Sequence, residues 1–257
     1  MCELLAVNAS DKLLLNDLLR SFFANADEHP NGWGMAFFYG NAVSLEKQPC
    51  NALKSAYLRE RLQARIETDK MMAHIRLATK GSMEYVNTHP FVMRDSSGRA
   101  WTLAHNGTIF ECDVLNHYVH TQQGQSDSER VLMYVIDRIN AEQLSAGRNL
   151  SAQERFRVIE KITAEISPEN KLNYLLYDGE LLYAHMNYKE SLHYCMRTGT
   201  VLISTRPLDS RDWREMPLNT VLAFQDGRLR FTGHDHGNEF FFSEEKWRLL
   251  FLDFAAL

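Results

Sequence analysis

The chain has 257 residues, a length that suits one large domain or two small ones. Hydrophobic residues make up 45% of it and charged residues 24%, the composition of an ordinary globular protein. The net charge of −5 and the scattered basic residues argue against nucleic acid or an anionic membrane as the main partner.

The first quarter of the sequence predicts two helices among short strands. Residues 3–8 read as an apolar strand, and residues 11–23 place leucine and phenylalanine at helical spacing with Asp11 as the N-cap. A Pro- and Gly-rich stretch at 27–34 predicts a loop. The expected elements after it are strands at 35–39 and 42–47, joined by a hairpin turn at Gly40-Asn41, and an amphipathic helix at 53–66.

The middle of the chain alternates apolar runs with polar loops and then predicts two helices. Ser126 and Glu129 have the spacing of a capping box, so a helix should begin there. The expected elements are a strand at 71–77, a loop at 78–90, a strand at 101–105 that runs into Asn106-Gly107, and helices at 126–139 and 153–166.

After Pro168 the pattern changes to short apolar runs separated by turns such as Asp178-Gly179. These runs predict antiparallel strands at 172–177, 180–185, 192–196, 201–204, 221–224 and 229–231. Because no Gly/Ser/Pro-rich linker and no internal repeat divides the chain, we expect a single domain over residues 1–257. Its class should be α+β, with antiparallel sheets covered by a few helices.

The cysteines suit a reducing compartment. They are Cys2, Cys50, Cys112 and Cys195, far apart and without a C-x-x-C pair, which fits neither a zinc site nor a small disulfide framework. The sequence shows no signal-peptide pattern and no run of about 20 apolar residues, so we expect a cytoplasmic protein outside the membrane. His234-Asp235-His236 should point in diverging directions on a turn, and we expect no metal and no cofactor.

Cys2 follows the initiator methionine, a position with a chemical meaning. Cysteine is small enough for a methionine aminopeptidase to remove Met1, which would leave a thiol and a free α-amine on one residue. The thiolate is a nucleophile, and the α-amine, whose ordinary pKa is about 7.7–8.0, can accept its proton, as in N-terminal nucleophile enzymes. Alternatively, Cys2 is simply the second residue of an apolar strand.

Polar residues after the predicted strands could serve such a nucleophile. Arg76 could bind a carboxylate through two parallel hydrogen bonds, or form an ordinary surface ion pair. Asn106-Gly107 offers a side-chain amide and an unobstructed backbone N–H, which suit an oxyanion hole, or it forms a plain turn. Asp127, in the first turn of a helix, could receive an α-ammonium group or merely favour the helix N-terminus.

Together these residues resemble the class II glutamine amidotransferase domains. The shared motifs occur in the family's order and spacing: Cys2, NGWG at 31–34, IRLAT at 75–79, NTHPF at 87–91, AHNG at 104–107, SDSE at 126–129, and STRPL at 204–208 followed by Trp213-Arg214. The similarity covers essentially the whole chain and is strongest to the stand-alone bacterial members of the YafJ type.

The resemblance implies an N-terminal nucleophile hydrolase fold, a four-layer αββα sandwich. It makes Cys2 the nucleophile with its own α-amine as general base, and it makes Asn106 and Gly107 the oxyanion hole. It assigns the other site residues to the amino-acid end of glutamine and the loop beside it: Arg76, Thr79 and Asp127 bind the substrate, and His89 supports the loop.

The implied reaction is hydrolysis of the side-chain amide of glutamine or of a γ-glutamyl compound through a Cys2 thioester, which releases glutamate and ammonia or an amine. Two features depart from the family: Lys80 stands where many members have histidine, and the chain carries no synthase domain. A separate synthase subunit could accept the ammonia, or the chain could be a slow, glutamine-binding regulatory subunit.

Aromatic residues at 240–242 and 247–251 either pack on the body or mark a dimer or partner interface.

Overall fold

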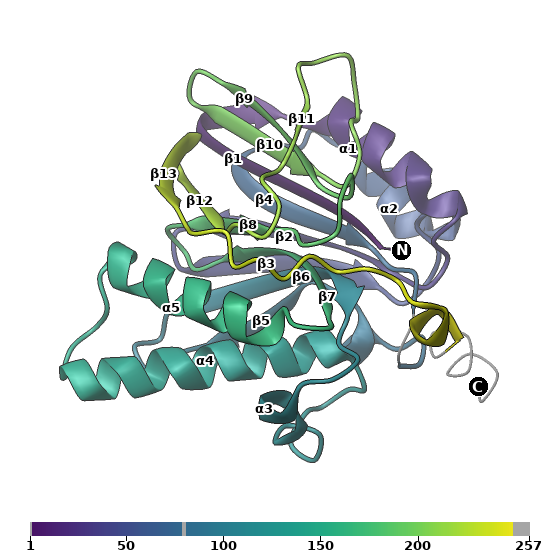
Figure 1. Ribbon diagram of the computed structural model, residues 1–257. Coiled ribbons are helices and arrows are strands. Elements are labelled where there is room, and N and C mark those ends of the chain that lie inside the picture. Colours follow the sequence, from purple (N-terminus) through teal and green to yellow (C-terminus); the bar gives the residue numbers. More distant parts are fainter. Residues whose placement is uncertain (1, 79–80, 249–257) are drawn as a thin grey trace.

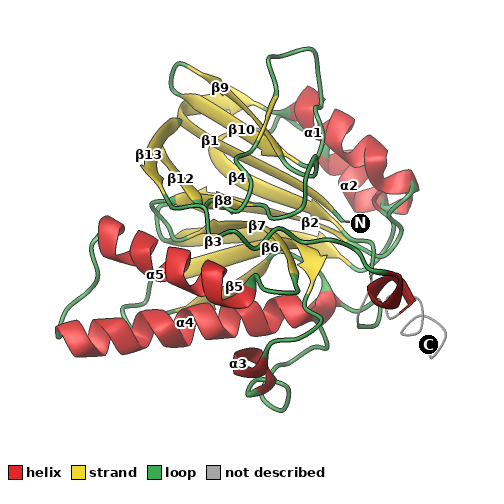
Figure 2. Cartoon of the chain, in the orientation of Figure 1, coloured by secondary structure: helices red, strands yellow, loops and turns green. Residues whose placement is uncertain are grey.

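Two antiparallel β-sheets lie face to face, and helices cover the outer surface of each (Figures 1 and 2). The structure is a computed structural model that describes residues 2–78 and 81–248. Within that part of the chain, the first sheet has seven strands in the order β11 (Arg214–Glu215), β9 (His193–Arg197), β10 (Thr200–Ser204), β1 (Glu3–Leu14), β4 (Glu67–Ile75), β2 (Trp33–Tyr39) and β3 (Ala42–Gln48). The second has six, in the order β13 (Arg228–Thr232), β12 (Leu222–Gln225), β8 (Leu182–His185), β7 (Lys171–Tyr177), β6 (Ala100–Thr108) and β5 (Phe91–Arg94).

The longer helices form two outer layers. On the seven-stranded sheet lie α1 (Asn16–Phe23) and α2 (Ala56–Arg61), and on the six-stranded sheet lie α4 (Asp127–Ala146) and α5 (Ala152–Ile166). Short helical turns occupy the connections: α3 (Asp113–Asn116) and three 3-10 segments, η1 (Ala24–Asp27), η2 (Ala52–Lys54) and η3 (Tyr85–Asn87). No helix in the described ranges combines the length and apolar character needed to cross a bilayer. The predicted α+β class and αββα layering are confirmed.

Alternation along the central strands supplies the apolar layers between these elements. In β1, Leu5 and Val7 face α1, whereas Leu4 and Ala6 face the second sheet. In β6, Ala104 faces the first sheet in the same way. Both faces of these strands are covered, so a polar side chain on either face is removed from bulk water. Such burial is unfavourable unless the side chain is hydrogen-bonded, so a buried polar residue here indicates a structural or functional role.

The strands predicted after Pro168 are all present, with boundaries that shift by one or two residues. The structure adds β11, a two-residue strand that pairs with β9 through Arg214 and Tyr194. Two residues are too few for an alternating pattern, so sequence periodicity could not reveal this strand.

Two helix predictions in the first quarter were too long. The predicted helix at 11–23 begins only at Asn16, because β1 continues through Leu14 and pairs there with β4. The predicted helix at 53–66 is reduced to a 3-10 turn followed by α2. The Asn16 side chain explains this end: it donates to the carbonyl oxygens of Leu62 and Ala64, which draws the chain away from α2 into β4.

The helix predicted at Ser126 is confirmed, but its capping box is not. The Ser126 hydroxyl accepts a hydrogen bond from the Ser128 backbone N–H at 3.3 Å and so caps α4. The Glu129 carboxylate instead accepts from the backbone N–H groups of Gln123 and Gly124, at 2.8 Å each. Glu129 therefore holds the preceding loop rather than the helix N-terminus.

The C-terminal aromatic residues pack on the body in the part that the structure describes. Phe240 is buried, and its ring stacks on that of Phe110 with 5.8 Å between centroids. Phe242 lies between Tyr188 and Trp247, whose centroids are 5.5 and 4.6 Å from its own. The rest of the predicted aromatic segment, residues 249–251, lies outside the described residues.

Four of the buried histidines have a lowered pKa, because burial disfavours their charged forms. Burial lowers the pKa of His74 and of His185 to about 3. Burial also lowers the pKa of His105, and it lowers that of His89 well below the ordinary 6.5. These four side chains are therefore neutral in the folded protein at neutral pH.

We expect the folded protein to lose stability as the pH falls below 6.5, the ordinary histidine pKa. In that range the unfolded chain binds a proton at each of these residues and the folded chain does not, so acid favours unfolding. The cost is roughly 1.4 kcal/mol per pH unit for each fully titrating histidine. Denaturant unfolding between about pH 7 and about pH 5 measures the slope, and His185→Gln should reduce it by about one proton. An unchanged slope in that variant would contradict this account.

Candidate active site

Cys2 and Asn106 line one cleft of about 420 Å³. Cys2 lies two residues before Leu4 and Asn106 two residues after Ala104, so strand alternation points both side chains into the space between the sheets. The cleft is lined by Cys2, Glu3, Glu28, His29, Asn106, Tyr188, Glu190, Ser191, Thr205 and Arg206. The predicted nucleophile and the predicted amide donor are thus brought together from different sheets.

The Cys2 thiol is held by the backbone at the end of β4. The Leu77 N–H donates to Sγ and the Leu77 carbonyl accepts from the thiol, both at 3.4 Å. Burial raises the pKa of Cys2, whereas the Leu77 hydrogen bond and the positive charges of Arg76 and Lys171 lower it. The thiol is therefore a weaker acid than usual, and nearby cations oppose the effect of burial.

Asn106 and Gly107 lie inside β6 rather than in a turn. Their partners across the sheet are Asn173 and Leu172 in β7, and β6 continues to Thr108, so the turn interpretation was wrong. A Cβ atom on residue 107 would lie 1.9 Å from the Lys171 carbonyl oxygen. Glycine is required here because the two strands approach too closely for any side chain.

Arg76 is buried directly after β4 instead of lying on the surface. Its guanidinium donates to the carbonyl oxygens of Gly81 and Ser82, at 3.0 Å each. Burial lowers the pKa of Arg76, while the charges of Cys2 and Asp127 raise it, so these groups act on one another electrostatically. Neither Arg76 nor Asp127 is among the described residues that line the cleft.

Asp127 is buried in the first turn of α4. Its carboxylate accepts from the Ile109 backbone N–H at 2.8 Å and from the Ser128 hydroxyl at 3.3 Å. Ile109 follows β6 directly, so this carboxylate joins the helix to the strand that carries Asn106. Both interpretations of Asp127, helix-terminal charge and ammonium acceptor, are compatible with this position.

His89 lies behind the loop that follows Arg76. Its ring stacks on that of His74 with 4.2 Å between centroids, and within the described residues neither ring nitrogen has a hydrogen-bond partner. The Lys47 ammonium donates to the neighbouring Thr88 carbonyl at 2.6 Å. These contacts fix the loop, whereas Thr79, predicted to bind substrate, lies outside the described residues.

Two asparagines with no predicted role also hold this loop. The Asn31 side chain accepts from the Ala78 backbone N–H at 3.0 Å. The Asn87 side chain accepts from the Gln125 N–H at 2.7 Å and donates to Ser82 at 3.2 Å. Asn31 belongs to the NGWG motif and Asn87 to the NTHPF motif. Membership of these motifs is the sequence feature from which their role could have been predicted.

An ionic group beside the nucleophile was not predicted from the sequence. The Glu3 carboxylate accepts hydrogen bonds from the Thr205 hydroxyl and from the Arg206 guanidinium, and it lies 3.7 Å from His29 Nε2. Thr205 and Arg206 belong to the STRPL motif, which therefore forms one side of the cleft. The sequence feature that could have indicated a role for Glu3 is its charge within an otherwise apolar strand.

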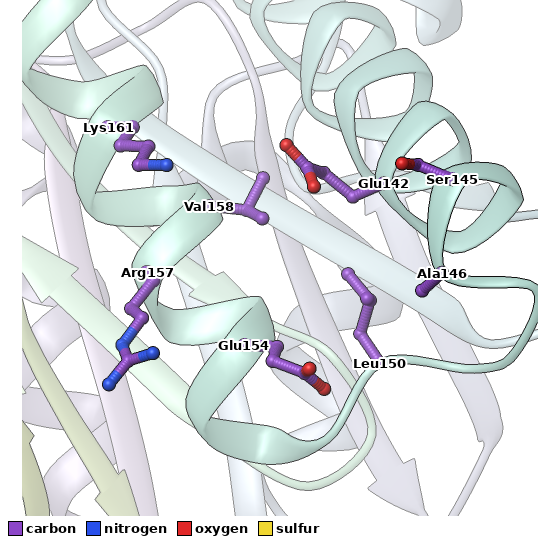
Figure 3. Close-up of a pocket in the computed structure, with 8 residues that line it drawn as sticks. All are labelled: Glu142, Ser145, Ala146, Leu150, Glu154, Arg157, Val158 and Lys161. Carbon is purple, nitrogen blue, oxygen red and sulfur yellow. The ribbon is translucent and has the colours of Figure 1, made fainter.

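A second hollow, of about 220 Å³, lies between α4 and α5, as Figure 3 shows. Charged side chains of both helices, including Glu142 and Lys161, surround the apolar Leu150 and Val158. It contains no cysteine and lies in an outer helix layer, so it is not a candidate for the same chemistry.

The described residues offer no metal site. Nowhere in ranges 2–78 and 81–248 do three His, Cys, Asp or Glu side chains gather closely enough to hold an ion. His234 contacts Glu160 at 2.8 Å, whereas His236 faces His185 with 2.9 Å between their Nε2 atoms. The two histidines of the sequence cluster therefore have separate neighbours.

Sequence comparison places this architecture in a family. Residues 1–201 match the family described as class-II glutamine amidotransferases. An uncharacterised protein of Methanocaldococcus jannaschii is 30% identical over 260 residues, which cover 90% of this chain and 71% of that protein. YafJ of Escherichia coli K12, whose name refers to a glutamine amidotransferase, is 28% identical over 211 residues, 80% of each chain.

Solved structures share the fold at lower identity. One described as a predicted glutamine amidotransferase from Pseudomonas aeruginosa has a TM-score of 0.63 and 21% identity, covering 89% of this chain and 99% of that one. Glutamine phosphoribosylpyrophosphate amidotransferase of Bacillus subtilis has a TM-score of 0.67 and 13% identity, covering 92% of this chain and 49% of that one. With the sequence match and the αββα sandwich, these likenesses lead to one conclusion: this chain belongs to the class II glutamine amidotransferases.

Proposed function

We propose that this protein hydrolyses the side-chain amide of glutamine or of a γ-glutamyl compound, with Cys2 as the nucleophile. The observation that carries the proposal is that Cys2 and Asn106 line one cleft, although they come from different sheets. A thiol facing a side-chain amide donor across a pocket is the arrangement that acyl transfer requires.

The proposed reaction proceeds through a thioester. Removal of Met1 would free the α-amine of Cys2, which accepts the thiol proton. The thiolate attacks the substrate carbonyl carbon, and the Asn106 amide and the Gly107 backbone N–H stabilise the oxyanion. The C–N bond then breaks, the leaving amine takes the proton, and water hydrolyses the thioester to glutamate and the free thiol.

The amino-acid end of the substrate would bind behind Cys2. There the Arg76 guanidinium could pair with the substrate α-carboxylate, and Asp127 with the α-ammonium. Arg76 now donates to the carbonyl oxygens of Gly81 and Ser82. We therefore propose that the substrate carboxylate replaces these carbonyl oxygens and that Thr79 also binds the substrate.

The cleft favours a γ-glutamyl amide with an amine larger than ammonia. Its volume of about 420 Å³ falls in the range of small-molecule sites. It also carries charged groups, Glu28, Glu190 and Arg206, that ammonia alone would not need. A separate ammonia-accepting subunit, which would cover the same cleft, is the alternative. A reducing cytoplasm would suit either form, since all four cysteines are free.

Loss of the nucleophile or of the amide donor should affect turnover to different degrees. Cys2→Ala should abolish glutamate release, because no other cysteine is among the described residues that line the cleft. Asn106→Ala should lower kcat by about 10²–10³-fold with a smaller change in KM, as expected for an oxyanion donor. Steady-state glutamate release measures both, with thermal unfolding as the control for folding. Full activity of Cys2→Ala would exclude this mechanism.

Offering two substrates in parallel separates the two forms of the proposal. Protein whose mass confirms the loss of Met1 is given glutamine and a γ-glutamyl dipeptide, with Cys2→Ala as the blank. We expect faster release of glutamate from the dipeptide, because the cleft can hold its second amino acid. Faster release from glutamine would instead favour an ammonia-consuming partner. Release from neither would leave the slow, glutamine-binding subunit as the better interpretation.

A further inference from the structure

Lys171 is a fully buried lysine at the start of β7, with 1% of its surface exposed. Leu175 and Tyr177, at the same phase of the strand, face the first sheet, so the Lys171 side chain also points into the space between the sheets. Its partner across the sheet is Thr108, and the next pair on this face is Asn106 with Asn173. Lys171 is therefore one step along the sheet from the proposed oxyanion donor.

The ammonium of Lys171 reaches the wall of the cleft. Its Nζ atom lies 4.8 Å from the centroid of the Tyr188 ring, and Tyr188 lines the cleft together with Cys2. Burial lowers the pKa of Lys171 to about 7, while the negative charges of Cys2 and Glu3 raise it. The charged groups that act on this lysine are thus the nucleophile and its neighbour in β1.

The other charged groups around Cys2 are already engaged. The Glu3 carboxylate, in β1, is paired with Arg206 and faces His29, and Asp127, at the start of α4, binds the Ile109 N–H. Arg76, after β4, holds carbonyl oxygens of the following loop. The remaining titratable groups that line the cleft are Glu28, Tyr188 and Glu190.

Besides the N-terminal ammonium, two side-chain cations act directly on the thiol, Arg76 and Lys171. When a substrate carboxylate pairs with Arg76, much of that guanidinium charge is offset. Lys171 lies on the other sheet, in β7, and the proposed pairing of the substrate carboxylate with Arg76 does not involve it.

We propose that Lys171 is a positioning residue that stabilises the Cys2 thiolate from within the space between the two sheets. It acts through Cys2 and forms no bond to the substrate, and the inference rests on the proposed role of Cys2 as nucleophile. Its ammonium opposes part of the effect of burial, which raises the pKa of the thiol, and so makes more thiolate available at neutral pH than burial alone would allow.

The test measures the acidity of Cys2 without any substrate. The rate of Cys2 alkylation by iodoacetamide is followed against pH, and mass analysis of the Cys2 peptide separates it from the other three cysteines. Lys171→Met should move the midpoint of the profile upward by about one pH unit, and so slow alkylation at neutral pH by about tenfold. Lys171→Arg, which retains the charge, should restore most of the effect.

The matched control is Lys70→Met. Lys70 is a partly buried lysine of β4 that pairs with Asp69 and Asp226, and its removal should leave the profile unchanged. Lys171→Met should also be at least as stable as the parent in thermal unfolding, because a buried ammonium opposes folding. Lys171→Gln provides a second neutral variant.

A folded Lys171→Met or Lys171→Gln variant whose midpoint matches the parent within about 0.3 pH units would overturn the proposal. Failure of both variants to fold would assign Lys171 a structural role and overturn it as well. Alkylation needs no turnover, so the two proposals fail separately. If only the hydrolase proposal is wrong, Lys171→Met still shifts the midpoint of Cys2 alkylation, but the parent protein releases no glutamate.

Discussion

The pairing of β1 between β4 and β10 is the constraint on which the site depends. Glu3 is opposite Ile75 in β4, and Leu5 is opposite Ser204 in β10. Extending the first register by one residue sets Cys2 opposite Arg76. Extending the second by two residues sets Glu3 beside Arg206, with which it forms an ion pair. A slip of one residue would turn Cys2 from the space between the sheets toward the helix layer.

Much of the fold follows from patterns that are local in the sequence. Alternating apolar runs and two-residue turns predict the strands after Pro168, and the Ser126 cap predicts α4. Predictions failed where distant contacts override local propensity. The leucines after Asp11 fit a helix, yet Leu13 and Leu14 belong to β1, where they pair with Thr68 and Glu67 of β4. Likewise α2 is short because the Asn16 side chain binds the carbonyl groups that follow it.

The site was predictable only in part, for a related physical reason. Cys2, Arg76, Asn106 and Asp127 lie in short motifs that sequence alone can identify. Lys171 stands in no motif, and its importance depends on which strand β7 pairs with and on which face of the sheet the side chain lies. Glu3 and Arg206 meet only because β1 and β10 are neighbours. Electrostatic groups around a nucleophile are thus properties of topology rather than of sequence spacing.

The central claim is that Cys2 carries the acyl group. Protein lacking Met1 can be mixed with a γ-glutamyl substrate, quenched in acid during the steady state and digested for mass analysis. The account predicts one γ-glutamyl group on the N-terminal peptide, attached at Cys2 and absent from Cys2→Ala. Turnover without any acylated Cys2 peptide, or acylation at another cysteine, would contradict it.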